Sequence, residues 1–230
     1  MMLLRRSISV LYRRMNMNVV EDEFERALQK HQEALDASER GDYVLALSMM
    51  NKVLAVLPHS AVAFYDRGLI YQQQGNEEAA ILDYSVALKL NPYDADSFNN
   101  RGVAYAAQGQ REKSLADYKE AIRLAPHDSK AFHNRGLFWA NQNENERAIA
   151  DYSTALYLNP HDAHIWFNRA ISYQEVGTIA DAIADYTRSI ELDPSDVEAY
   201  DSRGHLHLQQ GNLERAENDF ATVRRLNQLG

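Results

Sequence analysis

Apolar and aromatic residues recur along most of this chain at helical spacing, and the helical pattern itself repeats. In four stretches two aromatic residues stand seven positions apart, as Phe98 and Tyr105 do, which places both on one helix face. A short motif at the first aromatic residue returns every 34 residues, as Ala-Phe-Tyr-Asp-Arg-Gly (63–68), Ser-Phe-Asn-Asn-Arg-Gly (97–102), Ala-Phe-His-Asn-Arg-Gly (131–136) and Ile-Trp-Phe-Asn-Arg-Ala (165–170). This period predicts an array of helical repeats that share one continuous core.

Six repeats of 34 residues account for residues 27–230. Their boundaries are 27–60, 61–94, 95–128, 129–162, 163–196 and 197–230. Glycine or asparagine stands at the fifteenth place of every repeat, at Gly41, Gly75, Gly109, Asn143, Gly177 and Gly211. Because these residue types tolerate the left-handed conformation that ends a helix, each repeat is predicted to hold a first helix (A), a turn and a second helix (B).

The predicted helix ends carry matching signals. All five prolines stand at the thirty-second place, where a proline ends helix B. Two residues later comes a candidate N-cap for the next helix A, which is Ser60, Asp94, Asp128, Asp162 or Asp196. Small residues at the eighth and twentieth places, such as Gly136 and Ala148, allow helices A and B to cross closely. We therefore assign the aromatic and small-residue positions to the core, and we expect no cofactor.

This set of landmarks resembles the tetratricopeptide repeat, over about nine tenths of the chain. The resemblance implies an all-α fold, a right-handed α-solenoid or superhelix of six antiparallel helix pairs. It also implies that the A helices line a concave groove that binds a peptide or protein segment. We therefore expect residues 27–230 to form one repeat domain behind a basic segment, residues 1–26, and to act as a non-catalytic interaction scaffold.

The groove of such proteins is lined by a few places of helix A, among them the second, fifth, sixth and ninth. The residues at these places that we expect to contact a peptide are Tyr65, Asn99, Asn100, Lys130, His133, Asn134, Leu137, Phe167 and Asn168. A carboxylate clamp of the kind found in chaperone cofactors needs several lysine, arginine and asparagine residues in register, and Lys130 is the only basic residue that fits. We therefore do not expect a receptor for chaperone tails.

Asparagine recurs at the sixth place, in Asn100, Asn134 and Asn168, and we call these three residues the asparagine rail. The rail resembles the asparagine ladder in the superhelix of O-linked N-acetylglucosamine transferase, whose amides hold a peptide backbone. An amide offers both a donor and an acceptor, so it can pair with any peptide backbone. Two interpretations stay open: the rail binds a peptide, or its amides only solvate helix A.

Arginine at the seventh place and aspartate at the twenty-third vary together. Five repeats have both, as Arg67 and Asp83, Arg101 and Asp117, Arg135 and Asp151, Arg169 and Asp185, and Arg203 and Asp219, and the first repeat has neither. Pairing within each repeat leaves no residue over, whereas pairing with the next repeat leaves Arg67 and Asp219 without partners. We predict five ion pairs within repeats, with a structural role and with the bidentate geometry that suits arginine.

The two terminal repeats differ from the inner ones. In the sixth repeat Glu217 and Arg224 replace apolar residues of helix B, and in the first repeat Lys30 and Ala37 replace the two aromatic residues of helix A. An end repeat has no neighbour on its outer face, so that face must be polar or covered. We predict that both ends are capped and that the protein is a monomer.

The formal net charge is −9, although residues 1–20 carry four arginines and no acid. The acidic body argues against nucleic acid as the main partner. The chain has no cysteine, which excludes disulfides and thiolate metal sites. Because the eight histidines show no metal-binding arrangement and no catalytic motif is present, we expect neither a metal site nor an enzyme.

Residues 1–20 have an amphipathic helical pattern, with Leu4, Ile8 and Leu11 on one face. The segment resembles a mitochondrial transit peptide, because it is rich in arginine and free of acids. The alternatives are a helix that lies on the first repeat, or residues upstream of a later start at Met15 or Met17. No apolar run approaches the ~20 residues of a membrane helix, and we expect a cytoplasmic protein. If residues 1–20 direct import, the protein would instead be a fixed component or assembly factor of a mitochondrial complex.

Overall fold

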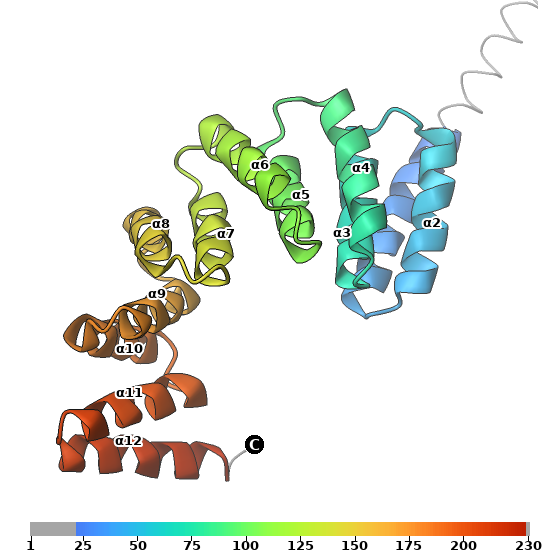
Figure 1. Ribbon diagram of the computed structural model, residues 1–230. Helices are drawn as coiled ribbons and strands as arrows, with labels where there is room; N and C mark the ends of the chain where they lie inside the picture. The colour runs from blue at the N-terminus through green and yellow to red at the C-terminus, as the bar shows by residue number, and fades with distance from the viewer. Residues whose placement is uncertain (1–21, 229–230) are drawn as a thin grey trace, which may run out of the picture. The chain divides into compact units, whose positions relative to one another are not determined.

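The computed structural model describes residues 22–228, and over this range all regular structure is α-helical (Figure 1). The predicted all-α fold of antiparallel helix pairs is confirmed. The chain divides into two compact units, Met1–Asp117 and Tyr118–Gly230, and each is described by itself. The predictions for residues 1–20 lie outside the described residues.

The N-terminal unit begins with a helix over residues 22–39, which starts ahead of the predicted repeat boundary at residue 27. It continues with α2 (Tyr43–Val56), α3 (Ala61–Gln73), α4 (Glu77–Leu90), α5 (Ala95–Ala107) and the first half of α6 (Arg111–Leu124). Each of α2, α3 and α4 packs against the helix that follows it. The helix over residues 22–39 joins this stack through Ala34 and Ala37, which share a core with Met50 and Ile70.

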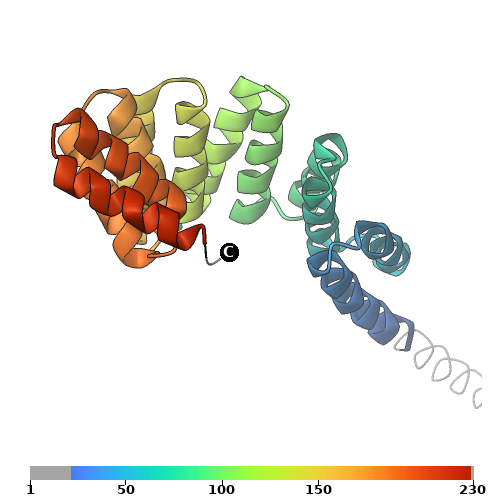
Figure 2. The same ribbon diagram turned by 90° about the horizontal axis from the view of Figure 1, so that it is seen from below.

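The C-terminal unit holds the second half of α6 and six further helices. These are α7 (Ser129–Ala140), α8 (Asn145–Leu158), α9 (Ala163–Glu175), α10 (Ile179–Leu192), α11 (Val197–Gln209) and α12 (Leu213–Leu226). From α7 onwards each helix packs against the next, and the pairing can be followed from a second direction in Figure 2. The odd-numbered helices are the predicted A helices, and the even-numbered ones are the B helices.

The turns between A and B helices have the predicted backbone conformation. The fifteenth residue of every repeat has a positive φ, from 70° to 81° at the five glycines and 57° at Asn143. Four of the five predicted N-caps accept a backbone N–H of the following helix, namely Ser60, Asp128, Asp162 and Asp196. Asp94 caps no backbone N–H, because its carboxylate accepts the hydroxyl of Ser97 instead.

Tyrosines at the twenty-fourth place form the centre of each inner repeat. Tyr84, Tyr118, Tyr152 and Tyr186 are at most 2 % exposed. The ring of Tyr152 lies so close to helix A that a Cβ atom at Gly136 would stand 2.6 Å from its Cε1 atom. The small eighth residue therefore makes room for this buried ring, as the core assignment requires.

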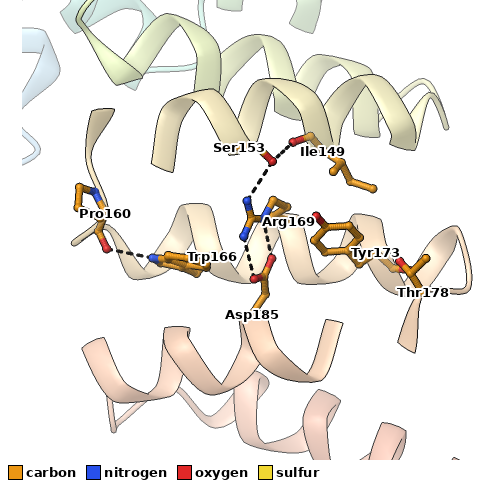
Figure 3. Close-up of polar contacts among 8 residues, drawn as sticks. All are labelled: Ile149, Ser153, Pro160, Trp166, Arg169, Tyr173, Thr178 and Asp185. Carbon is orange, nitrogen blue, oxygen red and sulfur yellow. Dashed lines mark hydrogen bonds and ion pairs between the residues drawn. The ribbon is translucent and has the colours of Figure 1, made fainter. Parts of the chain in front are cut away.

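The five predicted ion pairs are all present. In the pair shown in Figure 3, Nε and Nη2 of Arg169 donate to the two carboxylate oxygens of Asp185 at 2.6 and 2.9 Å. The guanidinium also lies over the rings of Trp166 and Tyr173, 4.9 and 5.5 Å from their centroids. Burial raises the pKa of Asp185, although its bond to Arg169 acts in the opposite direction. The carboxylate thus depends on its partner to stay charged.

Four of the five arginines of this row make one further described bond, to helix B of the preceding repeat. Nη1 of Arg169 donates to the hydroxyl of Ser153 at 2.9 Å (Figure 3), and the same bond joins Arg67 to Asn51, Arg101 to Ser85 and Arg203 to Thr187. Arg135 is the exception, because Lys119 stands at the position of the acceptor and has none to offer. The row therefore ties helix A to two B helices in most repeats.

The outer face of α12 carries the two polar side chains predicted for a capping repeat, together with Leu213, which is 66 % exposed. Nη2 of Arg224 donates to Oε1 of Glu217 at 2.5 Å, and both side chains are at least 60 % exposed. At the other end Lys30 is exposed and Ala37 is fully buried. The monomeric state stays a prediction.

Candidate functional site

In the N-terminal unit the candidate residues Tyr65, Asn99 and Asn100 are joined by hydrogen bonds. Nδ2 of Asn100 donates to the hydroxyl of Tyr65 at 3.0 Å, and Nδ2 of Asn99 donates to Oδ1 of Asn100 at 3.2 Å. Burial, and then the charges of Asp96 and Asp94, raise the pKa of Tyr65 to about 12. Tyr65 is therefore a neutral hydroxyl that holds the amide of Asn100 in a fixed position.

Asn99 was expected to face a peptide, but it is only 5 % exposed. Its side chain therefore offers a partner little surface, and its described bond supports Asn100. Tyr65 and Asn100 are partly exposed, as the expectation requires.

In the C-terminal unit the candidate residues His133 and Asn168 form an equivalent pair. Nδ2 of Asn168 lies 3.1 Å from Nε2 of His133, and the imidazole ring packs on Tyr152 with 5.9 Å between ring centroids. The ring of Phe167 packs in the same way on Tyr186, at 5.6 Å. Burial lowers the pKa of His133, so the ring is neutral at pH 7 and Nε2 can accept the amide N–H.

The remaining candidates of the C-terminal unit lie on α7. Lys130 is exposed, and its backbone N–H donates to the N-cap Asp128 at 3.0 Å. Asn134 is partly buried, and Leu137 is a partly buried side chain packed against the core of α8 and α9. Lys130 is thus the most exposed of the three, whereas Asn134 and Leu137 are both partly buried on the same helix.

The two rail bonds follow a rule that the sequence analysis did not anticipate. The sixth residue of a repeat bonds to the fifth residue of the preceding repeat, 35 positions earlier. His31 and Asp66 obey the same rule, with Nε2 and Oδ2 2.6 Å apart. The sequence contains a signal for these bonds. In each case the fifth place of one repeat and the sixth place of the following repeat both hold side chains that can form hydrogen bonds. The rail amides are therefore contacts between repeats as well as candidate contacts to a partner.

The environment of His133 predicts a pH-dependent stability. An unfolded histidine titrates near pH 6.5, and burial lowers the pKa of His133 in the folded chain. As the pH falls, the unfolded state therefore binds the proton first, and the folded state loses stability. We expect the unfolding temperature to fall as the pH is lowered from about 7.5 to about 5.5, and to fall less in His133→Gln. Some pH dependence of the unfolding temperature should remain in that variant, because burial also lowers the pKa of His207. Equal slopes in His133→Gln and in the exposed control His161→Gln would contradict this reading.

A cavity of about 440 Å³ opens between α9, α11 and α12 of the C-terminal unit. Its apolar lining includes Phe167 and Val223, and its polar lining includes Glu198 and Asp201. Phe167 was a sequence candidate, whereas the two acids and the cavity were not. The cavity depends on how three helices meet, which the pattern of a single repeat does not reveal.

Within residues 22–228 two features of other functional classes are absent. No group of three or more histidine, aspartate or glutamate side chains within residues 22–228 is arranged to hold a metal ion. No helix of the same range has both the length and the apolar character needed to cross a membrane.

Solved structures of similar fold include three proteins that each match at least three quarters of this chain. PilF of Pseudomonas aeruginosa is 21 % identical, with a TM-score of 0.77 over 89 % of this chain and 93 % of its own. PilW, described as a widely conserved type IV pilus biogenesis factor, is 21 % identical, with a TM-score of 0.77 over 86 % of this chain and 92 % of its own. YrrB, described as a TPR protein with an unusual peptide-binding site, is 18 % identical, with a TM-score of 0.61 over 77 % of this chain and 91 % of its own. At these identities the similarity shows the fold alone.

Comparison with sequences gives the family. None of the curated proteins matches the chain. Residues 95–128, 135–200 and 185–218 match three family models described as tetratricopeptide repeat, and residues 68–109 match a fourth described as TPR repeat. The four matches together extend over more than half of the chain, and the match over residues 95–128 coincides with the third repeat. The chain belongs to the tetratricopeptide repeat family.

Proposed function

We propose that this protein is a non-catalytic scaffold that binds an extended segment of a partner protein along its A helices. In the N-terminal unit Asn100, and in the C-terminal unit Asn134 and Asn168, would hold the backbone of a bound segment. YrrB, a protein of the same fold, is described as having a peptide-binding site.

The observation that carries the proposal is the fixed position of two rail amides. Asn100 is held by Tyr65 and Asn99, and Asn168 is held by His133. A primary amide has two donors and an acceptor with two lone pairs, so each described bond uses only part of its capacity. A donor or acceptor that is already ordered loses less entropy on binding than a mobile one. The amides are therefore prepared to bind a backbone.

The spacing of the rail also suits an extended peptide. Helices that pack side by side are ~9 Å apart, so Asn134 and Asn168, on A helices of successive repeats, are on the order of 10 Å apart. An extended chain advances ~3.3 Å per residue. Within the C-terminal unit, one rail amide would therefore meet about every third residue of an extended peptide.

A peptide selected on the wild-type protein tests the proposal. A random peptide library displayed on phage supplies the probe, and fluorescence polarisation measures the affinity of an enriched peptide. The triple variant Asn100→Ala, Asn134→Ala, Asn168→Ala is expected to bind at least about tenfold more weakly, because each lost hydrogen bond contributes about 1 kcal/mol.

Asn218→Ala is the matched control, since it removes an exposed amide from helix B and should leave the affinity unchanged. Circular dichroism shows whether the triple variant stays folded, because it also loses the bonds to Tyr65 and His133. A folded triple variant with wild-type affinity would refute the role of the rail. A library without any enriched peptide would refute the proposed function itself.

A further inference from the structure

The cavity between α9, α11 and α12 combines an apolar floor with an acidic edge. Phe167, Val197 and Val223 supply the apolar surface, and Glu198 and Asp201 supply the acids. Its volume of about 440 Å³ lies in the range of cavities that accept a ligand, about 300–1,000 Å³. No lysine, arginine or histidine lines it. A cavity of this composition favours a group that is apolar along its length and positively charged at its end.

Neither acid forms an ion pair with a lysine or arginine of residues 22–228. Glu198 is exposed and makes no ion pair with any residue of the range 22–228. The carboxylate of Asp201 is half exposed, and its Oδ2 lies 3.4 Å from Nδ1 of His205, which carries a charge only when it is protonated. Nδ1 of His205 also lies 2.8 Å from the backbone oxygen of Asp201. Both carboxylates can therefore take a further charged donor.

Within the C-terminal unit, acids at these two places are found on α11. The same two places of α9 hold His164 and Phe167, and those of α7 hold Lys130 and His133. Asp96 of α5 stands at the same place as Glu198, but two acids together at these places occur on no other A helix of residues 22–228. Phe167, which forms part of the apolar floor, is also one of the candidate peptide contacts. A peptide bound along the rail of the C-terminal unit would meet this edge at α11.

We propose that the cavity binds a lysine or arginine side chain of the partner segment, an inference that rests on the proposed function. The aliphatic stem of the basic residue lies on Phe167 and the valines, and its charged end meets Glu198 and Asp201. Long basic side chains pack in this way, with the stem on apolar surface and the charge toward polar groups. This chain already places guanidinium groups over aromatic rings, for example Arg147 over Trp139 at 4.8 Å.

A double-mutant cycle on the selected peptide tests the inference. The enriched peptides are expected to share a lysine or arginine, and replacing it with methionine keeps an apolar stem and removes the charge. The variant Glu198→Gln, Asp201→Asn is expected to bind the basic peptide about tenfold more weakly, and to bind the methionine peptide as the wild type does. The reversed variant Glu198→Lys, Asp201→Lys should in turn prefer a peptide with glutamate at that position.

The controls separate this inference from the proposed function. Glu146→Gln with Glu214→Gln removes two exposed acids from B helices, and it should leave both affinities unchanged. The inference would be overturned, and the proposed function left intact, by either of two results. The peptides could need the asparagine rail but share no basic residue, or they could bind the variant Glu198→Gln, Asp201→Asn as tightly as the wild type. The basic side chain could also come from a second copy of this chain, and light scattering detects such a dimer. A dimer that is lost in the variant Glu198→Gln, Asp201→Asn would overturn binding of a partner protein at this cavity.

Discussion

Asp185→Ala is expected to lower the free energy of unfolding by about 3–5 kcal/mol, because it leaves a largely buried guanidinium without its counter-charge. The side chains of Arg169 and Asp185 are 15 % and 6 % exposed, so water cannot take the place of the carboxylate. Arg169 would lose two hydrogen bonds and would keep the one to Ser153. Denaturant unfolding followed by circular dichroism measures the difference.

Two controls separate a buried unpaired charge from the loss of any ion pair. Glu191→Ala removes the partner of Arg188 at the surface, where the side chains are 56 % and 41 % exposed, and should cost less than about 1 kcal/mol. The double variant Arg169→Leu, Asp185→Leu removes both charges and should recover most of the loss. If Asp185→Ala cost no more than Glu191→Ala, the arginine row would have no structural role.

Tyr152→Ala is the second substitution with a large expected effect, a loss of about 3–5 kcal/mol in the free energy of unfolding. The side chain is 1 % exposed, and its ring fills the space above Gly136. Alanine would leave a cavity there, because glycine has no side chain that could occupy it. The imidazole of His133 would also lose the ring on which it packs.

Tyr152→Phe is the matched control, and the chain itself argues that it is tolerated. The sixth repeat has Phe220 at the same place, with its ring against Gly204 in the same manner. Tyr152→Phe should therefore change the free energy of unfolding by less than about 1 kcal/mol. Equal losses in the alanine and phenylalanine variants would show that the hydroxyl, and not the ring, is the important group.

The repeat made much of the fold predictable, because each position of the repeat is present in several copies. A wrong assignment in one copy can therefore be recognised by comparison with the other copies. Asn143 illustrates this: it alone would be a weak turn signal, but five glycines at the same place identified it, and its φ is 57°. The arginine and aspartate pairs were predictable for the same reason. A repeat with neither residue showed that the two belong together.

What the sequence did not reveal depends on geometry between repeats or on competition between neighbours. Asp94 had the composition of an N-cap, but the nearby hydroxyl of Ser97 took its carboxylate. Asn99 and Asn100 are adjacent amides, and only packing decides that Asn99 is buried. The cavity with Glu198 and Asp201 needs three helices in place before it exists. Periodicity assigns residues to a face of a helix, but it does not assign the depth of each side chain.

The arginine row has a consequence for how such a chain can grow. Its charged bonds lie within one repeat, as between Arg169 and Asp185, whereas its bonds to the preceding repeat use neutral acceptors such as Ser153. Gene duplication or deletion of a whole 34-residue segment therefore carries each buried cation together with its own anion. Among the bonds of the arginine row only a neutral one changes at the new junction, and Lys119 at the acceptor position for Arg135 shows that a natural junction can exist without it. The array can therefore lengthen or shorten by recombination without leaving a buried arginine of this row unpaired.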